Sequence, residues 1–240
     1  MGSEKSGRRP GAALRKLVRA VPGAAIAERV MRDHLLADLT RRRRFTDRYT
    51  RNYWRDPESR SGRGSSLAET EAIRAALPSL CRRLGVHSLL DIPCGDFNWM
   101  GLLALEDVSY TGADIVAALV DANRQRYGRS GRSFIVMDIA RSVPGRFDLI
   151  LCRDLMGHLP DRDIRRVLRN LRRSGSAWLL TTTFPERTRN EDLHGRDWRP
   201  VNLQLPPFAW PPPTAMIRED CPEPGYQDKS LGLWRLAEPG

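Results

Sequence analysis

Close cysteine pairs, long apolar runs and lysine are all scarce in this 240-residue chain. Its four cysteines lie far apart and form no CxxC pair, at Cys81, Cys94, Cys152 and Cys221. This spacing argues against a zinc site or a disulfide framework, so we expect reduced thiols and no bound metal. No apolar run approaches the roughly 20 residues of a membrane span, and the N-terminus lacks the apolar stretch of a secretory signal. We therefore expect a cytoplasmic protein without a transmembrane segment.

Acidic residues are too few near the N-terminus to balance the basic ones there. The net charge is +11, and within residues 1–65 Lys and Arg outnumber Asp and Glu by ten. We expect residues 1–57 to form a basic, partly helical extension and residues 58–240 to form the main domain. A basic arm can contact nucleic acid, an anionic membrane surface or an acidic partner. Because no nucleic-acid-binding motif is present, we expect no nucleic-acid partner.

Apolar strands alternate with amphipathic helices from about residue 67 onward. Strands are predicted over 88–92, 109–114, 133–138, 147–154 and 177–183, and helices over 25–55, 67–84, 99–105, 116–127 and 160–173. Two further strands, 215–218 and 231–236, are close enough in sequence to form an antiparallel pair. The alternation predicts an α/β fold with a mostly parallel sheet of seven strands and helices on both faces.

Carboxylates stand at the ends of the first three predicted strands. Asp91 precedes a turn containing Gly95, Asp114 follows that glycine by 19 residues, and Asp138 ends the third strand. Ligands of an open parallel sheet bind outside the carboxyl ends of its strands. An acidic residue about 20 positions after a glycine turn suits two ribose hydroxyls, and a third carboxylate can accept from an exocyclic amine. The pattern indicates a nucleoside site.

The GxGxxG fingerprint of dinucleotide-binding folds is missing from this turn. Pro93 and Phe97 stand where glycines are expected, and the Asp96 side chain would repel a pyrophosphate. A ligand with ribose and adenine but no phosphate fits better. S-adenosylmethionine (SAM) is such a ligand, and its ammonium group gives the buried Asp91 a partner.

The motifs resemble those of class I SAM-dependent methyltransferases. "LLDIPCGDFNWM", "YTGADIV", "FIVMDIA" and "FDLILCRDLMGHLP" are similar to the first four motifs of that superfamily. A loop at 58–67 and the segment 181–208, with "TTTF" and "WRPVNLQ", resemble a narrower bacterial group of methyltransferases. The resemblance implies the Rossmann-like class I methyltransferase fold, with SAM as cofactor. It also implies that the loop at 61–66 closes over SAM.

The resemblance assigns the cofactor-binding residues one by one. Asp91 and Gly95 line the methionine part, Asp114 takes the ribose hydroxyls, and Ile115 packs on the adenine. Asp138 accepts from the adenine amine. The full set of expected SAM-binding residues is Asp91, Pro93, Cys94, Gly95, Asp96, Asp114, Ile115, Asp138, Ile139 and Arg153.

Catalytic candidates follow the fourth strand. Methyl transfer is an in-line displacement, so alignment is the main task of the enzyme, and an alcohol acceptor must also lose a proton. His158 and Asp154 are the candidate bases, with His158 preferred because histidine titrates near neutral pH. The acceptor is expected to be a small molecule or a glycan, methylated on oxygen or nitrogen.

A long polar segment follows the fifth strand, and we interpret about 185–214 as an acceptor lid. Long irregular stretches in compact domains are often functional. The expected acceptor-binding residues are Asn190, Asp192, Trp198, Arg199 and Asn202, with His194 as a further candidate base. Trp and Arg beside polar groups would suit a sugar or a planar acceptor.

Three other functions compete with this interpretation. A nicotinamide-dependent oxidoreductase requires the glycine fingerprint that is missing. A nucleic-acid methyltransferase should carry a basic body, whereas residues 66–240 are nearly neutral. A non-catalytic SAM-binding or partner-recruiting module using the basic arm stays open, and the sequence does not indicate the oligomeric state.

Overall fold

The computed structural model describes residues 24–105 and 107–236. The chain divides into two compact units, Met1–Arg44 and Phe45–Gly240. Helix α2, Ala24–Thr50, begins in the first unit, and its residues from Phe45 onward belong to the second. We expected a basic extension over residues 1–57. Its residues 1–23 lie outside the described residues. Residues 45–57 of that expected extension belong to the compact second unit.

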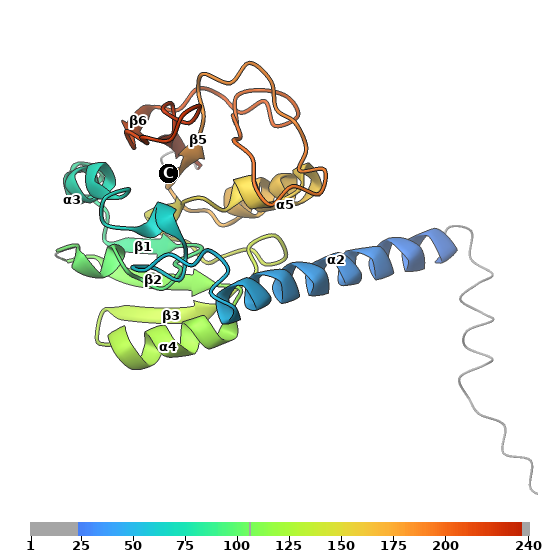
Figure 1. Cartoon of the computed structure of the whole chain (residues 1–240), viewed down its shortest axis with the longest axis horizontal. Coiled ribbons are helices and arrows are strands. Elements are labelled where there is room, and N and C mark those ends of the chain that lie inside the picture. The colour runs from blue at the N-terminus through green and yellow to red at the C-terminus, as the bar shows by residue number, and fades with distance from the viewer. Residues whose placement is uncertain (1–23, 106, 237–240) are drawn as a thin grey trace, which may run out of the picture. The chain divides into compact units, whose positions relative to one another are not determined.

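A seven-stranded sheet organises the second unit (Figure 1). Its order is β3-β2-β1-β4-β5-β7-β6. The parallel strands are β1 (Ser88–Asp91), β2 (Ser109–Asp114), β3 (Arg132–Val136), β4 (Leu149–Cys152) and β5 (Trp178–Thr183). Strand β7 (Ser230–Arg235) runs antiparallel to β5 and pairs with β6 (Ala215–Arg218), also antiparallel. The predicted mostly parallel sheet with an antiparallel C-terminal pair is confirmed.

Helices cover both faces of the sheet, as predicted. On one face, helix α3 (Glu71–Leu84) and helix α4 (Ala117–Tyr127) pack into a core cluster with Leu89 and Leu149. On the other face, helix α5 (Asp161–Arg173) packs against Leu90 and Ile150. Alternate residues of β1 and β4 therefore supply the two cores, which is the consequence of side chains pointing to opposite faces of a strand.

The strand order reverses between β1 and β4. The chain moves from β1 outward to β2 and β3, then returns past β1 to continue with β4 and β5. The loops after β1 and β4 therefore leave the same sheet edge in opposite directions. This arrangement opens a crevice at the carboxyl ends of the two strands, where α/β proteins bind their ligands.

The helix predicted over 99–105 is reduced to a single 3-10 turn, Met100–Leu102. The chain uses Gly95 and Phe97, both with positive φ, to turn sharply after β1. Trp99 and Met100 are buried, so this segment contributes to the core through its side chains and not through a helix.

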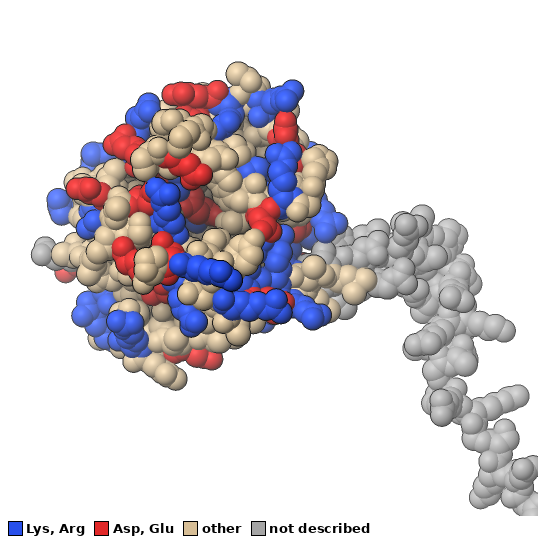
Figure 2. All heavy atoms as spheres, viewed as in Figure 1, with Lys and Arg blue, Asp and Glu red and all other residues tan. Residues whose placement is uncertain are grey.

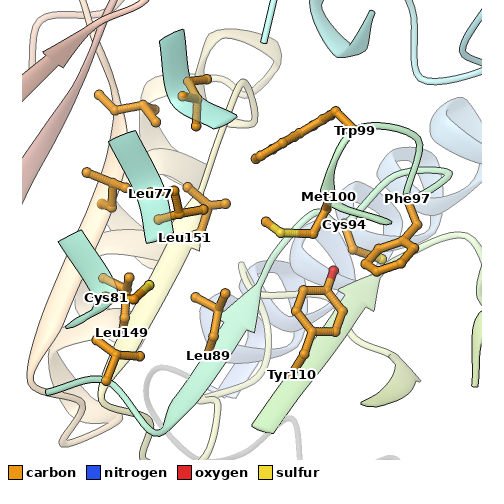
Figure 3. Packing of buried hydrophobic residues seen from close by; sticks show 14 of the residues in the cluster. Leu77, Cys81, Leu89, Cys94, Phe97, Trp99, Met100, Tyr110, Leu149 and Leu151 are labelled. Carbon is orange, nitrogen blue, oxygen red and sulfur yellow. The ribbon is translucent and has the colours of Figure 1, made fainter. Parts of the chain in front are cut away.

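Phe97 shows how a residue other than glycine is accommodated at position 97 of the turn after β1. Its ring is buried and lies 5.1 Å from the ring centroid of Tyr110, 5.1 Å from that of Tyr127 and 5.2 Å from that of Phe134. Figure 3 shows Phe97 and Tyr110 on the same side of the cluster. The side chain at this position holds the turn on the core and so offsets the strain of its φ of 61°.

Several element boundaries differ from the prediction by a few residues. Strand β3 ends at Val136 and not at Asp138, because the backbone carbonyl of Asp138 accepts from the N–H groups of Arg141 and Ser142 and turns the chain. Helix α3 begins at Glu71, four residues later than expected, and runs on through Pro78 as one helix.

Basic and acidic side chains are interspersed over the second unit on the face shown in Figure 2. This mixture agrees with the nearly neutral composition of residues 66–240. In the described part of the chain, no helix has the length and apolar character needed to cross a membrane.

Candidate functional site

The turn after β1 places backbone groups at the crevice. Gly95 has a φ of 54°, and a Cβ at this position would overlap the hydroxyl of Ser61. Both facts require glycine. The Gly95 carbonyl accepts a hydrogen bond of 2.8 Å from Asn123 of α4, and its N–H lies 3.3 Å from Oδ2 of Asp114. The turn is thus fixed from two elements, and it presents Pro93, Cys94 and Gly95 to the cleft.

Asp91 is the last residue of β1 and faces the cleft while only 3% exposed. Burial raises the pKa of its carboxyl to about 7, although the hydroxyl of Tyr110 donates to it at 2.8 Å. The nearby carboxylate of Asp114 raises this pKa further. A buried carboxyl group with a raised pKa is stabilised in its ionised form when a cation binds beside it.

Asp114 ends β2 on the neighbouring side of the same cleft. Burial raises its pKa to about 6, against the opposing effect of hydrogen bonds from the backbone N–H groups of Val116, Gly95 and Ile115. The Val116 N–H donates at 3.0 Å to Oδ1. Two buried carboxylates with raised pKa values therefore share one cleft.

The cleft has an empty volume of about 890 Å³, counting its open mouth, which is in the range of small-molecule sites. Its wall near Asp114 is apolar and consists of Ile115, Val116 and Leu119. Carboxylates that accept from hydroxyl and ammonium groups, beside an apolar surface for a purine, fit SAM. Asp91 would hold its ammonium group, and Asp114 would hold its ribose.

Two expected cofactor residues lie beside this cleft but do not line it. The Asp138 carboxylate accepts from the N–H of Ala140 at 3.1 Å and shapes the turn after β3. Ile139 is buried in the core beneath α5, and its carbonyl accepts from Asn170 at 2.8 Å. The described geometry gives both residues a role in building the turn, and the adenine contacts expected for them stay predictions.

Asp96 fastens the Ser-rich loop to the glycine turn, and the SAM contact expected for it stays a prediction. Its carboxylate accepts from the Ser59 hydroxyl at 2.9 Å, the Arg60 N–H at 2.7 Å and the Ser61 hydroxyl at 3.2 Å. The Ser61 hydroxyl in turn accepts from the Asp96 N–H at 2.9 Å. This latch fastens the Ser-rich loop to the glycine turn, and it places Arg60, Ser61 and Ser65 in the cleft wall.

Arg153 and Asp154 belong to a buried network of four charges. Arg153 contacts Glu219 at 2.6 Å and Asp154 at 3.2 Å, and Lys229 contacts the same two carboxylates at 3.1 Å and 2.8 Å. Despite desolvation, Arg153 and Lys229 hold the pKa of Asp154 well below its usual range. A carboxylate so firmly ionised is a weak proton acceptor, so this network favours His158 over Asp154 as the base.

His158 ends a 3-10 turn, Met156–His158, after β4 and lines the cleft. Its Nδ1 lies 2.8 Å from the backbone carbonyl of Asp197. Because a carbonyl only accepts, Nδ1 carries the proton in the neutral ring, and Nε2 carries the lone pair. The site thus holds a histidine in the tautomer required of a general base.

The segment 185–214 packs beneath this histidine, and its predicted acceptor residues lie outside the cleft wall formed by the described residues. Arg199 donates to the carbonyls of Gly157 and Leu159 at 3.2 and 2.8 Å and pairs with Asp161 at 2.6 Å. Trp198 packs so closely on Gly157 that a Cβ there would overlap it. These contacts support the turn that carries His158.

The remaining predicted acceptor residues hold the segment together. Asn190 and Asn202 bond each other, with the Asn190 side chain donating to the Asn202 carbonyl at 2.8 Å and accepting from its N–H at 2.9 Å. Asp192 accepts from the Asp161 N–H at 2.9 Å and stands at the start of α5. Their side chains are committed to backbone groups, so acceptor binding by them stays a prediction without a geometric basis here. His194 is exposed and does not line the cleft.

Sequence reasoning missed the aromatic residues of the cleft. Phe45, Tyr49 and Trp54, together with Trp99, line it beside His158. Their only signal was the clustering of aromatics just after the Arg-rich run at 41–44. Within the described residues, no group of three or more His, Cys, Asp or Glu side chains is arranged to hold a metal ion.

Comparisons with known proteins agree with the fold. Residues 89–175 match the family model described as "Methyltransferase domain". The segment that includes β1, β2 and β4 therefore carries the family signature.

The curated relatives are ubiquinone biosynthesis O-methyltransferases. The protein of Azotobacter vinelandii is 31% identical over 84 residues, covering 33% of this chain and 36% of that protein. The protein of Pseudomonas aeruginosa (strain LESB58) is 29% identical over 105 residues, covering 41% of this chain and 45% of that protein. The match thus spans less than half the length of each relative.

A solved structure shows the same fold at low identity. The methyltransferase domain of the bacterial protein CtHen1-C superposes with a TM-score of 0.53 at 13% identity, covering 71% of this chain and all of that domain. The sheet order, the family match over residues 89–175 and the relatives together support a class I SAM-dependent methyltransferase domain in this chain.

Proposed function

We propose that this protein is a SAM-dependent methyltransferase that methylates an oxygen of a small-molecule acceptor. The observation that carries the proposal is His158, held with its lone pair on Nε2, in the same cleft as Asp91 and Asp114. The names of the curated relatives, which are O-methyltransferases, support oxygen as the acceptor atom.

The proposed roles follow from the contacts. Asp91 binds the ammonium group of SAM, Asp114 binds the ribose hydroxyls, and the latched loop at 59–66 excludes water. When bound, SAM supplies a sulfonium methyl group, whose transfer forms the acceptor O–CH₃ bond, breaks the S–CH₃ bond and leaves the neutral thioether S-adenosylhomocysteine. Nε2 of His158 takes the acceptor hydroxyl proton and becomes an imidazolium, so charge is conserved.

Oxygen is favoured over nitrogen because of this base. A neutral amine already carries the lone pair that attacks the methyl group, whereas a hydroxyl reacts well only as its proton leaves. A histidine held by a backbone carbonyl and facing the cleft serves the second case. The acidic network at Asp154 and Glu219 keeps Arg153 in place and supports the cleft floor.

Arg199, Trp198 and Asp197 act as positioning residues in this proposal. They contact the turn Met156–His158 through backbone carbonyls and through the glycine at 157. The segment 185–214 thus contributes to catalysis by fixing His158, and its expected role as an acceptor lid stays a prediction.

The experiment measures S-adenosylhomocysteine formation with a panel of hydroxyl and amine compounds, together with SAM affinity. His158→Ala should reduce O-methylation by about 10²–10⁴-fold and leave the SAM dissociation constant within about twofold, because His158 contacts the acceptor side. Asp121→Asn, an exposed α4 position, is the control and should change neither quantity. A wild type that does not bind SAM, or a His158→Ala variant with full O-methylation, contradicts the proposal.

A further inference from the structure

Two aromatic rings flank His158 in the cleft. The ring centroid of Phe45 lies 6.1 Å from that of His158 with an interplanar angle of 88°, and the centroid of Trp54 lies 6.3 Å away at 66°. Both residues line the cleft and belong to the second unit, at the end of α2 and in the turn that follows. An acceptor whose oxygen reaches His158 must therefore lie against these rings.

Arg48 connects the rings of Phe45 and Trp54, which we call the aromatic wall, to the segment that holds His158. Its guanidinium is buried and lies 5.8, 5.2 and 5.9 Å from the ring centroids of Phe45, Tyr53 and Trp54. It also pairs with the carboxylate of Asp197, which accepts from the Tyr53 hydroxyl as well. Because the Asp197 carbonyl holds Nδ1 of His158, the wall and the base are fixed through one residue.

Tyr49 and Leu155 add further apolar lining to the cleft. Its polar lining includes Arg60, Ser61, Ser65, Arg153 and Asp154. The guanidinium of Arg60, which also lines the cleft, lies 5.2 Å from the ring centroid of Tyr49. The carboxylate of Asp154 is committed to Arg153 and Lys229.

These features discriminate between classes of acceptor. A glycan has a hydroxyl on nearly every carbon, and each buried hydroxyl costs free energy unless it finds a partner. A planar aromatic hydroxyl compound buries its two faces on aromatic rings and needs one hydrogen bond, at the reacting oxygen. Phe45, Tyr49 and Trp54 supply aromatic rings in the cleft that His158 lines, and His158 supplies the hydrogen-bond acceptor.

We propose that the acceptor is a planar aromatic compound with a hydroxyl group, bound against Phe45 and Trp54 with that hydroxyl on Nε2 of His158. The proposal rests on the proposed function and specifies its substrate class. In the reaction the phenolic O–H proton passes to His158 as the oxygen gains the methyl group. The wall formed by Phe45, Tyr49 and Trp54 is then the specificity determinant of the enzyme.

The test uses 2-naphthol as the planar probe and methyl α-D-glucopyranoside as the glycan probe, with the wild-type chain saturated with S-adenosylhomocysteine. Binding is followed by ligand-observed NMR, and turnover is followed as 2-methoxynaphthalene formed from SAM. We expect 2-naphthol to bind and to be methylated, and the glucoside to do neither. Binding of the glucoside with no binding of 2-naphthol would overturn the aromatic assignment, as would binding of neither compound.

Substitutions in the aromatic wall test whether 2-naphthol binds there. Trp54→Ala should weaken 2-naphthol binding about tenfold or more, while the affinity for S-adenosylhomocysteine stays within about twofold. Phe45→Leu, which removes the ring but keeps an apolar side chain, should give a smaller loss in the same direction. Trp178→Phe, at the opposite end of β5, is the matched control and should leave both affinities unchanged.

The outcomes separate this proposal from the proposed function. If S-adenosylhomocysteine and SAM do not bind, the proposed function itself fails. If they bind and 2-naphthol binds equally well to wild type and to both wall variants, the function stands and the aromatic wall is not the acceptor site.

Discussion

The hydroxyl of Tyr110 donates a 2.8 Å hydrogen bond to the carboxylate of Asp91 inside a cleft that leaves Asp91 only 3% exposed. One hydrogen bond does not offset the desolvation of a carboxylate, and the pKa of Asp91 is raised to about 7. The protein thus keeps an unfavourable group at the end of β1. We attribute this cost to the need for a negative charge where the ammonium group of SAM binds.

Replacing this carboxylate should stabilise the free protein. The folded protein favours the neutral carboxyl of Asp91, because its folded-state pKa is raised to about 7. The carboxyl therefore costs no stability below its unfolded pKa of about 4, and the cost grows as the pH rises to 7 and then stays constant. At pH 8 Asp91→Asn should therefore raise the free energy of unfolding by about 2–4 kcal/mol, with a much smaller gain at pH 5. Urea denaturation at both pH values measures this, and equal stability of variant and wild type at pH 8 would refute the burial cost.

SAM affinity should increase with pH across the same range. The ammonium group of SAM prefers the ionised form of Asp91, and protonation of Asp91 below its pKa of about 7 removes that partner. Calorimetric titration at pH 5.5, 6.5 and 7.5 should show affinity rising and then levelling off above about pH 7.5. In Asp91→Asn the affinity should be weaker by about tenfold or more, and its remaining pH dependence should lie near the pKa of Asp114, about 6. A wild-type affinity that is constant over these pH values does not fit an ammonium group on Asp91.

Gly157 controls the position of the proposed base. A Cβ at this position would overlap the indole of Trp198 and lie 2.7 Å from the Arg199 carbonyl, so Gly157→Ala must displace the turn that carries His158. We expect kcat to fall at least tenfold, because small misplacements of a reacting group are costly, with unchanged SAM affinity. Gly145→Ala is the matched control, since its nearest neighbour is a Phe147 ring atom 3.9 Å away. Unchanged kcat in Gly157→Ala would argue against His158 as the base.

The latch formed by Asp96 should control access to the cleft. Asp96→Ala removes the acceptor of the Ser59 and Ser61 hydroxyls and of the Arg60 N–H. We expect faster trypsin cleavage after Arg60 and Arg63 and faster dissociation of SAM, because the loop at 59–66 then opens more often. Asp121→Ala serves as the control. A digestion pattern identical to that of the wild type would mean that other contacts hold the loop.

The sheet and the carboxylates of the cleft were predictable because they depend on local patterns. Short apolar runs ending in Asp mark β1 and β2, and their alternation with helices predicted the mostly parallel sheet. The helix expected over 99–105 was wrong, because the chain after the sharp turn at Gly95 and Phe97 forms only a 3-10 turn at Met100–Leu102.

The acceptor side was harder to predict because it is assembled from distant segments. Phe45 and Trp54 precede β1 by more than 30 residues, and their proximity to His158 depends on Arg48 and Asp197, which are far apart in the sequence. Conversely, the polar residues of 185–214 had the composition of a binding segment. The folded chain uses Arg199 and Asn202 to satisfy backbone carbonyls, a need that no sequence pattern reveals.

The most direct measurement is calorimetric titration of SAM into wild type, Asp114→Asn and Asp121→Asn. Asp114 accepts at the ribose position in our account, whereas Asp121 is exposed on α4 and paired with Arg124. We predict micromolar binding by wild type and Asp121→Asn and a loss of about tenfold or more in Asp114→Asn. Absence of SAM binding by the wild type, or equal affinity in all three proteins, would contradict the assignment of this cleft.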